Sequence, residues 1–217
     1  MLYTILATII GFIAFLILFV ALKLLIKRQW VTGFLRGTIG LCVLVLGIGA
    51  ALAAYDMYTY RAIEVDKPIA TLSFTKLADQ RYKATYASLT DGEQRDVELS
   101  GDQWQMDARI LRWKGPAKML KIKPGYRLDR LSGRYYSIED EETKKRTAYE
   151  LKTSDALDFW SLVHQSDGLL PLVEASYGSA AYLPMADGAL FQVSIGMTGL
   201  SAQALNPAAE AVSASWQ

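Results

Sequence analysis

The start of the chain decides its fold, since residues 2–22 read LYTILATIIGFIAFLILFVAL. This run has no charged residue, and a helix of about 20 residues crosses the roughly 30 Å hydrocarbon core of a bilayer. Lys23 follows it, and a lysine at the end of such a helix can extend its ammonium group to the lipid headgroups. The run therefore predicts a membrane-spanning helix.

A second uncharged run, residues 37–54, is 18 residues long and predicts a second span. We expect helices at about 2–26 and 34–55, joined by a loop at 27–33. A cleaved signal peptide is the alternative for each run. However, the first run lacks a basic segment before it, and the second lies far inside the chain.

The basic residues of this region indicate an orientation. Lys23, Lys27, Arg28 and Arg36 all lie between or beside the two runs, and loops rich in lysine and arginine stay in the cytoplasm. The loop is therefore predicted to be cytoplasmic. Both termini and the C-terminal domain are then extracytoplasmic, which is the periplasm of a bacterium with two membranes.

Small residues recur along the second predicted helix at spacings of 4, 3, 7 and 4, namely Gly33, Gly37, Gly40, Gly47 and Ala51. A stripe of small residues lets helix backbones approach closely in lipid. Its partner is either the first helix of the same chain or a second copy in a homo-oligomer. Neither run contains Asp, Glu or His, which argues against transport by these two helices alone.

The rest of the chain has a different composition. The first 55 residues hold four basic and no acidic residues, which leaves 19 basic and 22 acidic residues and a net charge of −3 for the remainder. A nucleic-acid-binding domain is usually strongly basic, so nucleic acid is not an expected partner.

Alternation of polar and apolar residues begins near residue 69 and is typical of half-buried antiparallel strands. Turn-forming pairs such as Asp91-Gly92 separate the alternating segments. The expected strands are 70–75, 80–89, 95–99, 103–113, 126–131, 134–138, 147–153 and 191–197. One short helix should follow Ser154 as its N-cap and end before residue 166.

These patterns predict a membrane-anchored all-β protein, mainly an antiparallel sandwich or barrel with one short helix, plus an N-terminal two-helix transmembrane hairpin. The expected regions are the hairpin at 1–55, a juxtamembrane linker at 56–68, a β-rich domain at 69–206 and a flexible tail at 207–217.

Signatures of catalysis are missing from the sequence. His164 is the only histidine, which excludes a serine triad and a multi-histidine metal site. The acidic run 139–142 lacks the spacing of a calcium loop and suggests a solvated turn. We expect no catalytic, cofactor or metal residues; an enzyme would need carboxylates such as Asp102 and Asp107 to converge in a cleft.

Two segments are candidate binding sites. Within the basic stretch 109–134, Lys118, Lys121 and Lys123 are candidate contacts to an anionic lipid surface. The alternative is that strand alternation divides these charges and pairs them with acids. The segment 177–189 is rich in small residues between aromatics and suggests a ligand or partner groove at Tyr177, Ser179, Tyr182 and Met185, or else a tightly packed connection.

Segments 101–109, 126–135 and 177–189 resemble a family of small bacterial inner-membrane proteins that often carry the name cation/multidrug efflux pump or multidrug transporter. The resemblance covers most of residues 1–200. It implies a two-pass inner-membrane protein with a periplasmic domain, and it brings no active site. The transporter name fits poorly with two helices that lack intramembrane charges.

The leading hypothesis is a non-catalytic accessory or scaffold protein of the inner membrane. Its expected partners are the lipid bilayer and either a membrane or periplasmic protein or another copy of the chain. The alternative is a periplasmic module that binds a lipid or another envelope ligand, as an auxiliary to a transport complex.

Overall fold

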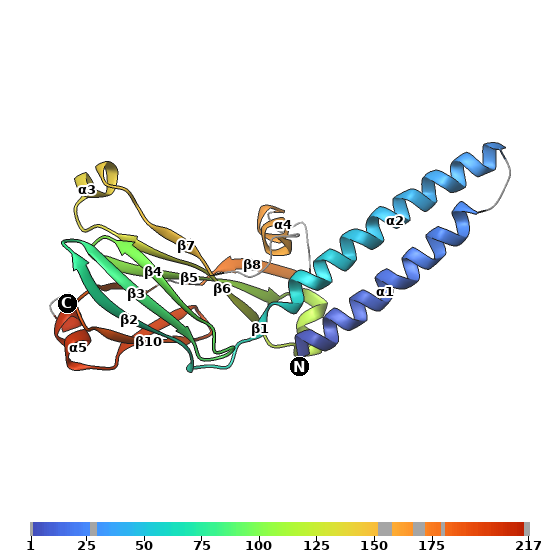
Figure 1. Ribbon diagram of the computed structural model, residues 1–217. Helices are drawn as coiled ribbons and strands as arrows, with labels where there is room; N and C mark the ends of the chain where they lie inside the picture. Colours follow the sequence, from blue (N-terminus) through green and yellow to red (C-terminus); the bar gives the residue numbers. More distant parts are fainter. Residues whose placement is uncertain (1, 27–29, 152–157, 167–171, 179–180, 215–217) are drawn as a thin grey trace. The chain divides into compact units, whose positions relative to one another are not determined.

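The computed structural model describes residues 2–26, 30–151, 158–166, 172–178 and 181–214 (Figure 1). They form two compact units, each assembled from separate parts of the chain. The first unit contains residues 1–62, 113–125 and 153–174. The second contains residues 63–112, 126–152 and 175–217.

Two long apolar helices make up most of the first unit, α1 (Leu2–Leu25) and α2 (Trp30–Tyr58), which lie side by side (Figure 1). Both are long and apolar enough to cross a membrane. Large apolar side chains such as Phe12 and Leu46 are 62% and 69% exposed, as lipid-facing positions would be. The predicted hairpin is confirmed as two long apolar helices. Helix α2 is longer than expected, because it starts before residue 34 and ends after residue 55.

Three short elements complete the first unit: β1 (Arg61–Ala62), the 3-10 helix η1 (Gly115–Leu120) and α4 (Phe159–Gln165). Asp56, buried in the last turns of α2, accepts a hydrogen bond from the backbone N–H of Phe159 at 3.2 Å. Helix α4 buries Trp160 and uses Asp158 as its N-cap, whose side chain accepts from the Ser161 N–H. The predicted N-cap Ser154 lies outside the described residues.

A five-stranded antiparallel sheet forms one layer of the second unit, in the order β11-β10-β2-β3-β4. Its strands are β2 (Lys67–Ala78), β3 (Arg81–Ser88), β4 (Gln94–Ser100), β10 (Leu190–Ile195) and β11 (Leu200–Ala204). In the register of β2 and β3, Phe74 faces Ala84. Gln80 supplies the left-handed backbone, at φ 51°, of the tight turn between them.

The second sheet is built around β5 (Gln103–Trp113), with β6 (Gly125–Arg134) and β8 (Val173–Tyr177) as its neighbours. Strand β7 (Ala148–Glu150) pairs with β6, and β9 (Ala181–Pro184) pairs with β5. Phe74, Trp104 and Phe191 meet in the core with ring centroids 5.6 to 6.2 Å apart. The predicted all-β fold is therefore confirmed, with two sheets rather than a closed barrel.

The structure differs from the predicted elements in several places. Strands β8, β9 and β11 were not expected. The strand predicted at 126–131 lies within β6, but of the strand predicted at 134–138 only Arg134 is in a strand, because β6 ends there and a helix begins at Ile138. The acidic run forms a short helix, α3 (Ile138–Thr143), where a turn was predicted. Ser137 caps this helix by accepting a hydrogen bond from the Asp140 N–H.

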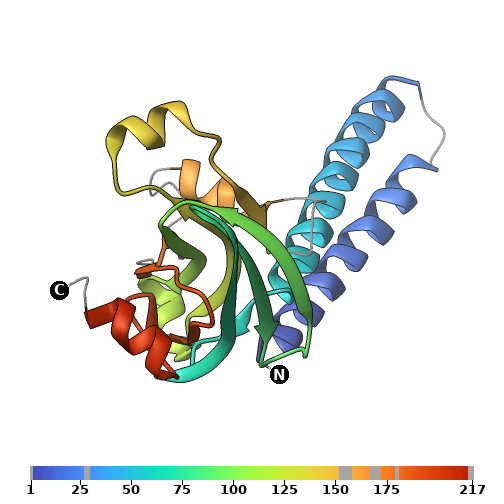
Figure 2. The same cartoon turned by 60° about the vertical axis from the view of Figure 1, so that its left-hand side comes forward.

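Where a flexible tail was predicted from residue 207, residues 207–214 form helix α5 (Pro207–Ala214). Helix α5 lies beside β10 and β11 (Figure 2) and buries Ala209 completely. The Asn206 side chain accepts hydrogen bonds from the Ala209 and Leu190 N–H groups and donates one to the Gly188 carbonyl. This cap joins the helix to the sheet.

Candidate binding recess

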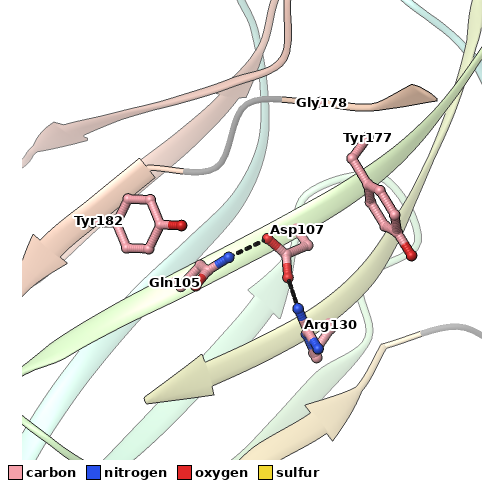
Figure 3. Close-up of a pocket in the computed structure, with 6 residues that line it drawn as sticks. All are labelled: Gln105, Asp107, Arg130, Tyr177, Gly178 and Tyr182. Atoms are coloured by element: carbon pink, nitrogen blue, oxygen red, sulfur yellow. Dashed lines mark hydrogen bonds and ion pairs between the residues drawn. The ribbon is translucent and has the colours of Figure 1, made fainter. Parts of the chain in front are cut away.

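Two of the predicted groove residues, Tyr177 and Tyr182, line a recess of about 300 Å³ in the second unit. Gln105, Asp107, Arg130 and Gly178 complete the lining (Figure 3). Met185, the third predicted groove residue, is buried in the core and is not among these lining residues. The remaining predicted groove residue, Ser179, lies outside the described residues.

Asp107 lines the recess and accepts hydrogen bonds on both of its carboxylate oxygens. One of its carboxylate oxygens accepts from Gln105 Nε2 at 2.6 Å. The other accepts from Arg130 Nε at 3.0 Å and Nη2 at 2.6 Å. Gln105 and Asp107 can share this face because alternate residues of a strand point the same way.

The ion pair of Asp107 and Arg130 is unequally exposed. The side chain of Asp107 is 8% exposed and that of Arg130 is 44% exposed. A buried carboxylate needs a partner of opposite charge, so Arg130 is held in place by its own counter-ion. The recess therefore presents the positive member of the pair to solvent.

The hydrogen bond from Asp107 raises the pKa of the Arg130 guanidinium above its ordinary value. Arginine is already charged at neutral pH, so Arg130 keeps its positive charge throughout the physiological range. The carboxylate of Asp107 holds Gln105 and Arg130 in place through both of its oxygens.

Two tyrosines form the sides of the recess. Tyr182 lies opposite Gln105 in the register of β5 and β9, and the Arg134 guanidinium lies 5.0 Å from the centre of its ring. Tyr177 is half exposed. The next residue, Gly178, donates its N–H to the Ala108 carbonyl, and a Cβ there would lie 3.0 Å from Ile110 Cδ1. A small residue at 178 thus allows Tyr177 to stand close over β5.

Asp102, the other carboxylate considered for catalysis, is not part of the recess. It accepts hydrogen bonds from Gln80 Nε2 and from the Tyr136 N–H. Gln80 also bonds to Asp140, and Lys144 contacts both Gln80 and Asp140. This network holds α3 against the turn between β2 and β3, which is a structural role.

Within the described ranges, no group of three or more His, Cys, Asp or Glu side chains is arranged to hold a metal ion. The recess offers guanidinium, amide and phenol groups, which suit recognition of an anionic or hydrogen-bonding group. The sequence pattern named Asp107 only as a carboxylate that an enzyme would need, and it did not indicate Gln105 or Arg130 as site residues. The available signal was a carboxylate and an amide inside β5, a strand whose residues 103–108 are all buried.

The basic residues of the stretch 109–134 fall into two groups, those that pair with acidic side chains and those that do not. Two of its strand arginines form ion pairs, Arg109 with Asp129 at 2.7 Å and Arg130 with Asp107. Lys114 pairs with Glu174 at 3.1 Å. Lys118, Lys121 and Lys123 are exposed and make no ion pair with any residue that the structure describes.

The small-residue stripe packs within the chain at one position. A Cβ on Gly47 would lie 3.2 Å from Leu18 Cγ and 3.3 Å from Ile17 Cγ2, so α1 and α2 approach closely there. Gly40 is buried, and Gly37 and Ala51 are half-buried. At Gly33, by contrast, a Cβ would meet nothing within 4 Å.

Comparison with known proteins finds no matching family, curated protein or solved structure. The resemblance to inner-membrane proteins called efflux pumps thus stays a prediction.

Proposed function

We propose that this protein is a non-catalytic, membrane-anchored scaffold whose strand domain binds a protein partner in the periplasm. The strand domain is the second unit, residues 63–112, 126–152 and 175–217. Helices α1 and α2 would cross the bacterial inner membrane, with the basic loop between them in the cytoplasm. The observation that carries the proposal is the recess in which buried Asp107 fixes Arg130 between two tyrosines.

The composition of the recess favours a protein partner. Tyrosine and arginine are the residue types that most often dominate the binding energy of protein interfaces. Arg130 is already ordered by Asp107, so little side-chain entropy would be lost when a partner binds. Because the exposed member of the ion pair is cationic, the complementary group is an Asp or Glu side chain of the partner.

The geometry is less suited to the alternative of a lipid-binding module. Acyl chains need a pocket lined mainly by apolar side chains. The lining of this recess is an arginine, an aspartate, a glutamine, a glycine and two tyrosines. The space between the sheets is filled by the cluster of Phe74, Trp104 and Phe191.

The test is site-specific photocrosslinking in native membranes, with a benzophenone amino acid in place of Tyr182. We expect a discrete protein adduct, formed at this position and not when the probe replaces the exposed Leu77 on β2. Arg130→Lys should weaken it because lysine cannot donate the two parallel bonds of a guanidinium. Loss of a charged hydrogen bond costs about 1.5–3 kcal/mol, which is roughly 10- to 150-fold in affinity.

Arg81→Lys is the matched control, since Arg81 forms an exposed ion pair with Glu98 on the other sheet. It should leave the adduct unchanged. An adduct that is insensitive to Arg130→Lys would contradict the proposal. An adduct to lipid instead of protein would favour the ligand-binding alternative.

A further inference from the structure

The segment 114–124, here called the lysine loop, belongs to the same unit as the two long helices. It contains η1 and the three lysines that have no ion-pair partner among the described residues. Met119, between two of these lysines, is 85% exposed, while Ala117 is buried. The lysine loop therefore exposes one large apolar side chain, Met119, together with three positively charged side chains.

The lysine loop is tied to the first turn of α1. The hydroxyl of Tyr3 donates a hydrogen bond of 2.8 Å to the backbone carbonyl of Lys123. Gly125 fits here because a Cβ at that position would collide with the Tyr3 ring. Lys121 turns the chain back with a left-handed backbone at φ 51°, and its N–H donates to the Lys118 carbonyl.

Tyr3 is also the first residue of the candidate span Tyr3–Lys23. Tyrosines at the ends of membrane helices lie at the level of the lipid headgroups. A loop bonded to the hydroxyl of that tyrosine is therefore held at headgroup depth. Lysine side chains there meet lipid phosphates, and a methionine side chain can enter the acyl region.

We propose that the lysine loop is a membrane-contact site for anionic phospholipid. Lys118, Lys121 and Lys123 bind headgroup phosphates of the leaflet at the start of α1, and Met119 inserts below them. The site rests on the membrane anchoring included in the proposed function and is independent of the recess. At about 1 kcal/mol for each basic residue, three lysines give a preference for an anionic surface of roughly 100-fold.

The test uses the full chain in lipid nanodiscs. Cys42 is the only cysteine, so Cys42→Ala with Met119→Cys gives one site for an environment-sensitive fluorophore. In nanodiscs containing phosphatidylglycerol we expect blue-shifted emission that is quenched by lipids spin-labelled near the headgroup. In phosphatidylcholine alone the shift should be smaller. It should also weaken between 0.01 and 0.15 M salt, as the screening length falls from about 30 to 8 Å.

The triple variant Lys118→Gln, Lys121→Gln and Lys123→Gln should abolish the response to phosphatidylglycerol. A matched triple, Lys67→Gln, Lys76→Gln and Lys83→Gln, removes the same charge from ion-paired lysines of the strand domain and should keep it. Protection of α1 and α2 from protease in the same nanodiscs reports the anchoring separately. Helices that are protected while the fluorophore stays in water, or responds equally to both lipids, would overturn the proposal.

Discussion

At the scale of single residues, the strand domain depends on one close crossing of backbones. A Cβ on Gly133 would collide with the Ser100 carbonyl oxygen, and Gly101 beside it has a positive φ of 134°. Asp102 donates its N–H to the Arg134 carbonyl at the same crossing. Only glycine allows the end of β6 and the turn between β4 and β5 to approach this closely.

Gly133→Ala should therefore lower the free energy of unfolding by about 1–3 kcal/mol, the usual cost of overpacking where backbone cannot move away. Gly196→Ala is the control, because its Cβ would lie 3.7 Å from the nearest atom, the Gly199 carbonyl oxygen. Thermal denaturation of both variants checks this. Equal stability of the two would contradict the account of the crossing.

The residues of the candidate recess could be predicted only in part. Tyr177 and Tyr182 lie in a segment whose small and aromatic residues indicate a site. Asp107 and Arg130 are 23 positions apart in the sequence, and their contact depends on how β5 and β6 pair. Alternation shows which residues share a strand face, but not which side chain of a neighbouring strand they meet.

At the scale of elements, the close packing of α1 and α2 depends on Gly47. Gly47→Ile should separate the helices, because a branched side chain there would overlap Ile17 and Leu18. Gly49→Ile is a matched control two residues away, since a Cβ at Gly49 would meet nothing within 4 Å. Thermal stability in mild detergent should fall for the first variant only. Equal effects would show that Gly47 has no special role in the helix pair.

Helix α5 depends on the cap at Asn206, which makes three hydrogen bonds. Asn206→Ala should destabilise the strand domain by about 1–2 kcal/mol, as loss of an N-cap does. Glu210→Ala changes an exposed residue of the same helix and should have little effect. Chemical denaturation separates the two variants, and an unaffected Asn206→Ala variant would contradict the importance of this cap.

Elements were predictable where the signal is local. The two long helices follow from uncharged runs, and β3 and β5 follow from strict alternation. Strands β8, β9 and β11 have only 4 or 5 residues each and gain their regular structure from a neighbouring strand. Helix α5 consists mainly of small residues such as alanine, and the sequence alone does not distinguish such a segment from a tail.

At the scale of the whole molecule, the two units do not follow the order of the sequence. Segments 113–125 and 153–174 are inserted between strands of the second unit, yet they belong to the first. The sequence predicted one boundary near residue 55 because composition changes there, and composition carries no information about later segments that return to the helices.

The strand domain has a core of its own, so it should fold without the helices. A fragment of residues 62–217 should give a β-type circular dichroism spectrum and a cooperative melt. A fragment of 62–206 lacks α5 and leaves the site of Ala209 open, so it should melt at a lower temperature. A non-cooperative melt of the longer fragment would contradict an independent core.

The central claim is that α1 and α2 hold a binding domain on the extracytoplasmic side of a membrane. Reporter fusions after Gln217 in a Gram-negative host test it most directly. An alkaline phosphatase fused there should be active, and a fluorescent protein that matures only in the cytoplasm should be dark. A dark phosphatase fusion together with a bright fluorescent one would place the domain in the cytoplasm and contradict the account.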